Sequence, residues 1–284
     1  MHKLTFECEV LTPLFMYGAN SKEDLELRTS EIKGMMRFWW RAIMSENNIE
    51  KLQKEEGKIF GSTDEKSKFM IRIRDYKLNL SNYKYGSFNP LPHKENLSFK
   101  KMGFIPRLNF NIEITIFENN YKVLIENIFI LTTILGGFGN RSRRGFGSIK
   151  INNSRDFGFE EINYKIILQK LNFIRNTYQI TSNKIQNISK GGGNYPWIKE
   201  IEIGKNRYND YNYLLKKIGD ATHLYSVPSL DNANPRMASP IYVSVIENNK
   251  HYYPIITTLN SVFPSYYPKL NIHKQSEFKN KILQ

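Results

Sequence analysis

The sequence predicts an α+β fold whose first half is a small antiparallel sheet carrying two helices on one face. Three segments alternate apolar and polar residues, which is the period of a half-buried strand: residues 4–10, 69–76 and 108–116. Two segments repeat apolar residues at spacings of three and four, as helices facing a core do: residues 32–43 and 121–135. With a short strand at 146–151, the order is strand, helix, strand, strand, helix, strand, which is that of a ferredoxin-like (RRM-like) domain.

The first strand places Leu4, Phe6, Cys8 and Val10 on one face, and Pro13 ends it because proline cannot donate to a neighbouring strand. Cys8 is therefore expected to be a buried core thiol rather than a nucleophile. It is the single cysteine of the chain, which excludes a disulfide framework and any site that needs several cysteine ligands.

The helix at 32–43 is expected to begin after Ser30, a plausible N-cap residue. Trp39 and Trp40 fall on its apolar stripe, so both are expected in the core rather than stacked on bases. Between the second and third strands lies a long polar insertion, residues 77–106, and an insertion of this length is uncommon unless it is functional or flexible. Its aromatic residues are Tyr83, Tyr85, Phe88, Phe99 and Phe104.

From residue 152 the pattern weakens and predicts a second, smaller α+β unit, with a first domain at 1–155 and a second at 156–284. Helices are expected at 162–178, at 208–217 and after Pro268, with a polar linker at 181–194. Residues 241–246 and 251–259 are typical of two strands joined by a turn at Asn248-Asn249.

The charge of the chain favours a polyanionic partner. Its 284 residues carry 41 Lys and Arg against 27 Asp and Glu, a net charge of +14, with 13% aromatic residues that argue against disorder. Charged residues interrupt the longest apolar run, 128–135, so no membrane span is expected, and the N-terminus does not resemble a signal peptide. These features predict a soluble cytoplasmic protein that binds nucleic acid.

A Gly- and Arg-rich segment, residues 136–147, is the most specific local motif. Its five glycines permit close backbone approach and positive φ, and its three arginines match phosphate oxygens. The spacing fits neither a Walker A loop nor a dinucleotide fingerprint, so nucleotide hydrolysis is not supported. We expect phosphate binding, with a solvated turn as the alternative. The candidate residues are Gly136, Gly137, Gly139, Asn140, Arg141, Ser142, Arg143 and Arg144.

The start of the first helix is a second candidate phosphate site, because backbone N–H groups at a helix start can hold an anion. Gly34 costs roughly 1 kcal/mol relative to alanine inside a helix, so close backbone approach is a reason for its presence. Arg37 and Arg41 contact RNA, or they pair with a glutamate or merely face solvent; both alternatives stay open. The candidate residues are Arg28, Ser30, Lys33, Gly34, Arg37 and Arg41.

No catalytic or metal-binding set is recognisable in the sequence. The five histidines are scattered without ligand spacing, and no nucleophile, base and orienting group occur together. His223 is a candidate general base, although a structural histidine is the favoured interpretation. We expect no cofactor, no metal and no small-molecule substrate.

Several motifs resemble the RAMP superfamily, and within it the family of Cmr subunit one from type III-B CRISPR effector complexes. They are LTPLF at 11–15, ELR at 26–28, SEIKGMMRFWWRA at 30–42, IFGS at 59–62, the Gly-rich segment, and RMASPI at 236–241, which adds Arg236 to the candidate RNA-binding residues. Residues 151–233 carry little of the resemblance.

The resemblance implies two tandem ferredoxin-like domains in a cytoplasmic ribonucleoprotein of antiviral defence. It implies a noncatalytic subunit that holds the 3′ part of the CRISPR guide RNA, the target RNA or both, beside other subunits of the Cmr complex and away from any membrane. The helix start and the Gly-rich loop are then expected to converge on RNA phosphates.

Two rival hypotheses remain. The first is a metal-independent RAMP endoribonuclease that processes CRISPR precursor RNA with His223 or tyrosines. Some RAMP relatives use a histidine near the first strand and helix, but this chain has none between that strand and Asn20. The second rival is a structural adaptor whose charge meets acidic partner proteins.

Overall fold

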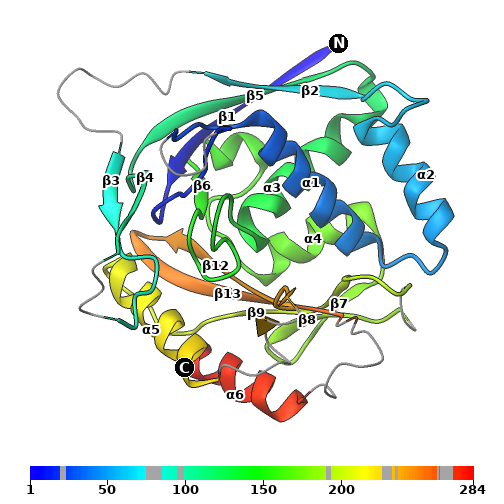
Figure 1. Ribbon diagram of the computed structural model, residues 1–284. Helices are drawn as coiled ribbons and strands as arrows, with labels where there is room; N and C mark the ends of the chain where they lie inside the picture. The colour runs from blue at the N-terminus through cyan, green and yellow to red at the C-terminus, as the bar shows by residue number, and fades with distance from the viewer. Residues whose placement is uncertain are drawn as a thin grey trace.

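The fold of the chain, shown in a computed structural model, is a mixed α/β architecture of four layers. The structure describes residues 1–19, 24–74, 85–94, 99–189, 193–225, 232–233, 236–260, 262 and 271–284. From top to bottom, Figure 1 shows a sheet, a layer of helices, a second sheet and a final pair of helices. The predicted mixture of helices and sheets is confirmed.

The first sheet has the order β2–β5–β1–β6, with antiparallel neighbours throughout. Its strands are β1 (His2–Val10), β2 (Phe69–Arg74), β5 (Asn109–Ile116) and β6 (Ile149–Ile151). The strands predicted at these four places are confirmed. Their apolar faces turn inward, and Phe6, Ile112 and Ile114 are fully buried. Cys8 is buried as expected, and burial raises the pKa of its thiol well above the usual range.

Four helices form the layer below this sheet: α1 (Thr29–Met44), α2 (Ile49–Phe60), α3 (Lys122–Leu135) and α4 (Tyr164–Ile174). A 3₁₀ turn, η1 (Asn119–Tyr121), leads into α3. The prediction of Ser30 as the N-cap is wrong, because Arg28 occupies that position without a side-chain cap bond and Ser30 lies in the first turn. Helix α2 was not predicted; Asn48 caps it by accepting a hydrogen bond from the Lys51 N–H.

The second sheet has the order β12–β13–β9–β8–β7 and is also antiparallel. Its strands are β7 (Tyr178–Thr181), β8 (Lys184–Asn187), β9 (Ile198–Ile203), β12 (Ile241–Asn248) and β13 (His251–Leu259). A turn joins the two strands as predicted, but its residues are Asn249 and Lys250, both with left-handed φ, because Asn248 still pairs with His251. The predicted linker at 181–194 is wrong where the β7–β8 hairpin forms. The helix predicted at 162–178 is shorter than expected, because α4 ends at Ile174.

The last layer consists of α5 (Tyr211–Leu224) and α6 (Ile272–Leu283), which lie beneath the second sheet in Figure 1. Two short strand pairs and one 3₁₀ turn complete the described chain. The hairpin of β3 (Tyr85–Phe88) and β4 (Lys101–Phe104) lies within the predicted insertion, a 3₁₀ turn η2 (Ser154–Phe157) follows β6, and β10 (Asn232–Ala233) pairs with β11 (Arg236–Met237).

Apolar residues of both halves share the interior. One cluster fills the space between the two sheets and includes Trp39 and Trp40, as predicted for core residues. A second cluster lies between the second sheet and the last helices, and Phe15 and Phe146 of the first half enter it. The domain boundary at residue 155 stays a prediction. No helix within the described ranges is long and apolar enough to cross a membrane.

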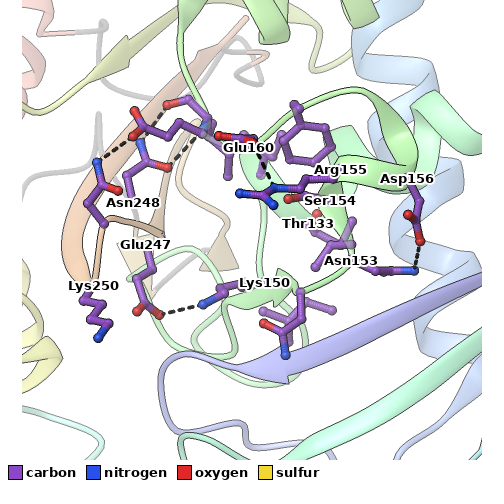
Figure 2. A pocket seen from close by; sticks show the side chains of 18 residues that line it. Thr133, Lys150, Asn153, Ser154, Arg155, Asp156, Glu160, Glu247, Asn248 and Lys250 are labelled. Carbon is purple, nitrogen blue, oxygen red and sulfur yellow. Dashed lines mark hydrogen bonds and ion pairs between the residues drawn. The ribbon is translucent and has the colours of Figure 1, made fainter.

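Glu247, on β12, is held by two cations of the first half. Its side chain is 4% exposed, and Oε2 lies 2.7 Å from Arg107 Nη1 and 3.4 Å from Lys150 Nζ. Figure 2 shows the contact with Lys150. Arg107 also donates to Glu9 at 2.5 Å and to the Tyr252 hydroxyl at 2.7 Å. This network therefore fastens the first sheet to the second.

We expect Glu247→Gln to lower the free energy of unfolding by about 1 to 2 kcal/mol. The substitution removes the counter-charge of Arg107 and Lys150, although both cations keep some exposure to water. Glu160→Gln is the matched control, because Glu160 pairs with Arg155 at 2.9 Å on the surface and its loss should cost less than about 0.5 kcal/mol. Urea unfolding measures both, and equal losses would contradict the fastening role.

Candidate nucleic-acid interface

The Gly-rich segment forms a loop between the two sheets whose ends are buried, while residues 139 and 141–143 are half-buried and Asn140 is exposed. Gly139 and Gly147 have φ of 75° and 67°, and a Cβ atom there would collide with the carbonyl oxygens of Phe15 and Phe138 respectively. The Phe138 N–H donates to Gly147 O at 2.9 Å, which draws the two ends of the loop together. The protein's own backbone, rather than a ligand, therefore occupies the space beside these glycines.

Arg143 and Arg144 attach the loop to the second sheet. Arg144 is buried, and its Nη1 donates to the Ile241 carbonyl at 3.1 Å while its guanidinium lies 5.5 Å from the ring centre of Phe278. Arg143 donates to the Ser239 carbonyl. The loop also pairs with β12, since the Gly145 N–H donates to Val243 O at 2.8 Å. These two predicted phosphate ligands have a structural role at the junction of the halves.

Arg141 lies on the side of the loop that faces β4 and α5. Its guanidinium is 6.0 Å from the ring centre of Phe146. Its charge lowers the pKa of Lys101 on β4 and of His93, in each case after the larger effect of burial. Arg141 thus places the positive charge of the loop near Lys101 and His93, two residues of the predicted insertion.

The helix start and the loop meet, as expected. The Gly139 N–H donates to the Glu31 carboxylate, and the Asn140 N–H donates to Phe15 O at 2.9 Å. Arg28 Nη1 donates to Tyr17 O at 3.4 Å. Burial raises the pKa of the Glu31 carboxyl, while the Gly139 hydrogen bond and the charge of Arg28 oppose that rise.

Tyr17 contacts two cations that come from separate parts of the sequence. The Lys101 ammonium lies 4.9 Å from the centre of the Tyr17 ring, and Arg28 contacts the Tyr17 carbonyl. Arg141 acts on Lys101 from the loop. We call Arg28, Lys101 and Arg141 the basic cluster. Lys101 could not be predicted as a site residue, because no local signal distinguishes it from the other lysines of the insertion.

The remaining cations of α1 lie against α2 and the turn that follows it. Arg37 and Arg41 approach the Glu56 carboxylate at 3.2 Å and 2.8 Å, and Lys33 Nζ donates to the Ser67 hydroxyl at 2.8 Å. Of the two alternatives left open for Arg37 and Arg41, the structure shows the glutamate pairing. These three residues therefore contact protein partners away from the basic cluster.

The other candidate residues differ in what surrounds them. A Cβ atom at Gly34 would meet nothing within 4 Å, so the packing of the described chain does not explain this glycine. By contrast, Cβ atoms at Gly136 and Gly137 would press against Trp39 and the Phe146 carbonyl. Ser30 is exposed, Ser142 is half-buried, and the side chain of Arg236 lies outside the described residues.

The cleft in Figure 2 has a different character from the basic cluster. It has a volume of about 570 Å³ and lies between β6, η2 and the turn from β12 to β13. Its charged lining residues are Lys150, Arg155, Lys250, Asp156, Glu160, Glu161 and Glu247. Carboxylates outnumber cations there, and Lys150 and Arg155 already pair with two of them. A polyanion is therefore favoured at the basic cluster and not in this cleft.

Two histidines lie near the basic cluster. The rings of His93 and His223 stack with their centres 4.8 Å apart and an angle of 9° between the planes. Among the described residues, no group of three histidine, cysteine or acidic side chains is placed to hold a metal ion. The candidate base His223 is thus stacked on a second imidazole, a contact that no local sequence signal predicts.

Comparisons with known proteins define the class of the chain. The model of the RAMP superfamily matches residues 7–150, slightly more than half of the sequence. The chain belongs to the RAMP superfamily. Within it, the chain belongs to the family of the Cmr1 subunits: the CRISPR system Cmr subunit Cmr1-2 of Pyrococcus furiosus is 34% identical over 185 residues, which cover 55% of this chain and 98% of that relative.

Further similarities extend over almost the whole chain. The Cmr subunit Cmr1-1 of Pyrococcus furiosus is 27% identical over 298 residues, covering 91% of this chain and 88% of the relative. A crystal structure of Cmr1 from Pyrococcus furiosus in its apo form gives a TM-score of 0.66 at 21% identity, covering 99% of this chain and 96% of that one. A subunit in a cryo-EM structure of the type III-B Cmr-beta bound to cognate target RNA gives 0.63 at 14% identity, covering 98% and 99%. The two structures show a shared fold.

We expect Gly147→Ala and Gly34→Ala to change stability in opposite directions. The first forces an alanine into a left-handed φ and makes its Cβ collide with the Phe138 carbonyl oxygen, so it should cost at least about 2 kcal/mol. The second adds a methyl group in open space within a helix, and should stabilise by about 0.5 to 1 kcal/mol. Thermal and urea unfolding measure both changes. A tolerated Gly147→Ala would contradict the tight packing of the loop.

Proposed function

We propose that the chain is a noncatalytic RNA-binding subunit of a cytoplasmic type III-B Cmr ribonucleoprotein. In this proposal the basic cluster binds phosphates of the guide RNA, in its 3′ part, of the target RNA, or of both. Two observations carry the proposal: Arg28 and Lys101 both contact Tyr17, and the Gly-rich loop meets the helix start through the hydrogen bond from Gly139 to Glu31. Membership of the Cmr1 family and the likeness to a subunit of an RNA-bound complex support it.

The chemistry of the basic cluster suits a phosphate backbone. Arginine forks match phosphate oxygens, and Lys101 adds a point charge beside them. The side chain of Arg28 is 43% exposed and lies 3.8 Å from the exposed carboxylate of Glu26, so an RNA phosphate would compete with Glu26 for it. Phosphate contacts carry no base information, and binding at this site is therefore expected to depend only weakly on sequence.

The aromatic residues of the insertion have separate roles in this proposal. Tyr85 is 41% exposed and packs edge-on against Phe104, so one side of its ring is open for stacking on a base or on a neighbouring subunit. Phe88 is half-buried and lies 6.4 Å from Phe15, measured between ring centres, which favours an anchoring role. Tyr83 lies outside the described residues.

We also propose that the two halves are related ferredoxin-like units, with the insertion at 77–106 in the first. The order β12–β13–β9–β8 of the second sheet corresponds to β2–β5–β1–β6 of the first. In both halves a helix follows the central strand and another follows its antiparallel neighbour: α1 and α3 in the first, α5 and α6 in the second. The difference is that β8 precedes its unit in sequence, whereas β6 ends the first unit. The division at residue 155 belongs to this proposal.

We expect the combined substitution Arg28→Gln, Lys101→Gln and Arg141→Gln to weaken binding of single-stranded RNA and flatten its salt dependence. Each lost phosphate contact should reduce the slope of log affinity against log salt by about 0.7. Arg37→Gln with Arg41→Gln is the control, because those arginines pair with Glu56. Filter binding at several salt concentrations measures both. Unchanged affinity in the triple variant would favour the adaptor hypothesis.

A second experiment separates RNA binding from RNA processing. Purified protein incubated with labelled CRISPR precursor RNA and no divalent metal is expected to leave the RNA intact. Gel electrophoresis would reveal discrete products if the chain were a metal-independent endoribonuclease. Products that disappear in His223→Ala would overturn the noncatalytic assignment and make the stacked histidines the active site.

A further inference from the structure

A small pocket lies between the β3–β4 hairpin, the Gly-rich loop and α5. Its volume is about 240 Å³, less than half that of the larger cleft described above. Figure 1 shows the end of β3 next to α5. The walls include Phe88 at the end of β3, Pro92 in the turn that follows, Phe146 of the Gly-rich loop, and Asn212, Leu215 and Lys216 of α5. Segments that are far apart in the sequence thus assemble this pocket.

The pocket is apolar at its closed end and polar at its mouth. Phe146 and Leu215 are buried, with 2% and 3% of their surface exposed. Asn212 and Lys216 are exposed and lie at the entrance. The described residues that line the pocket include no carboxylate, whereas carboxylates outnumber cations in the larger cleft. The entrance therefore favours a ligand that is neutral or negatively charged.

The wall formed by the insertion is held in place by the protein itself. Asn89 closes the turn, because its Nδ2 donates to Lys94 O at 2.7 Å and its Oδ1 accepts from the Leu91 N–H at 2.8 Å. The turn lies so close to α5 that a Cβ atom at Gly219 would be 3.4 Å from the Pro92 ring. The pocket is therefore formed before a ligand enters, which reduces the entropy lost on binding.

The pocket adjoins the basic cluster through two of its aromatic walls. Phe88 pairs directly with Lys101 across the hairpin, and such residues share a face with Cβ atoms about 4.5 to 5.5 Å apart. The Arg141 guanidinium lies 6.0 Å from the ring centre of Phe146. Phe15 packs between the two walls, with its ring centre 6.4 Å from that of Phe88 and 5.3 Å from that of Phe146. A ligand in the pocket is thus next to Lys101 and Arg141.

This combination matches the chemistry of single-stranded RNA. Each nucleotide joins a charged phosphate to a flat ring that is apolar on its faces and polar at its edge, and such rings stack on aromatic side chains. The closed end of the pocket suits the faces of the ring, and the Asn212 amide and the Lys216 ammonium suit its edge. An apolar side chain of a protein would fill the closed end but offers nothing to these two groups or to the adjacent cations.

We propose that the pocket receives one unstacked nucleobase of the RNA whose phosphates the basic cluster binds. The pocket rests on the proposed function and extends it from phosphate contacts to a base contact. Phe88 and Phe146 provide the apolar walls, while Lys101 and Arg141 hold the neighbouring phosphates. Because the walls recognise the faces of a ring, the pocket adds affinity for any base rather than a strong sequence preference.

The test compares two strands of equal length and charge, an oligouridylate and an abasic ribose-phosphate strand, with the full chain. Both strands can contact the basic cluster, but only the oligouridylate can fill the pocket. Fluorescence anisotropy should show that the wild type binds the oligouridylate at least about fivefold more tightly. Photocrosslinking with an oligouridylate that carries 4-thiouridine should attach the base to peptides that contain Phe88 or Leu215. Crosslinks only to other peptides would overturn the pocket.

Two variants alter the pocket without changing the charge of the chain. Phe88→Leu keeps an apolar wall but removes the aromatic ring, and Asn212→Met extends an aliphatic chain across the mouth. The Asn212 N–H, which donates to Asp210 at 2.9 Å, is kept. Each variant should lose about three- to fivefold in affinity for the oligouridylate and bind the abasic strand as the wild type does. Tyr213→Leu is the control, because Tyr213 is 72% exposed on α5 and does not line the pocket.

Failure of the pocket can be distinguished from failure of the proposed function. Arg28→Gln with Lys101→Gln alters the basic cluster and should weaken binding of both strands to the same extent. If this variant binds both strands like the wild type, the proposed role of the cluster fails. If it weakens both while Phe88→Leu and Asn212→Met keep the wild-type preference for the oligouridylate, the cluster stands and the base pocket alone is overturned.

Discussion

The passage of the Gly-rich loop between the two sheets is the constraint on which the rest of the structure depends. At Gly139 and Gly147 the backbone adopts left-handed φ and contacts the carbonyl groups of Phe15 and Phe138, so no side chain fits. The buried guanidinium of Arg144 then reaches the Ile241 carbonyl in β12. Because this loop contacts the helix start on one side and the second sheet on the other, it holds these two parts of the molecule, and Arg141 with them, in a defined arrangement.

Many cations of the chain pair with carboxylates of the protein itself. Arg37 and Arg41 pair with Glu56, and Arg107 pairs with Glu9 and Glu247, so these cations hold elements together. Their potential is largely cancelled nearby and does little to attract a polyanion. The net charge of +14 is therefore a poor guide to the RNA interface by itself. Arg28 of the basic cluster also lies 3.8 Å from Glu26, so the charge at this cluster is partly offset as well.

Local periodicity predicted most helices and strands of the first half. It carries no information on contacts between segments that are distant in sequence. The strands at 4–10 and 108–116 were evident because alternation is a property of consecutive residues. Helix α2 was missed because it is mostly polar and contains Gly57, and the β7–β8 hairpin because its strands have only four residues each. The helix start and the loop were recognised as candidates from their own sequences. Lys101 and His93 were not, because only the folding of the insertion brings them to Arg141.

The arrangement of the two histidines bears on the choice between binding and catalysis. Metal-independent cleavage of RNA needs a base at the attacking 2′-hydroxyl and an acid at the leaving oxygen, and an in-line displacement puts those oxygens on opposite sides of the phosphorus. The rings of His93 and His223 are nearly parallel, with centres 4.8 Å apart. Stacked in this way they present their edges together and do not enclose a phosphate between them. This pair therefore does not provide a base and an acid on opposite sides of a phosphate.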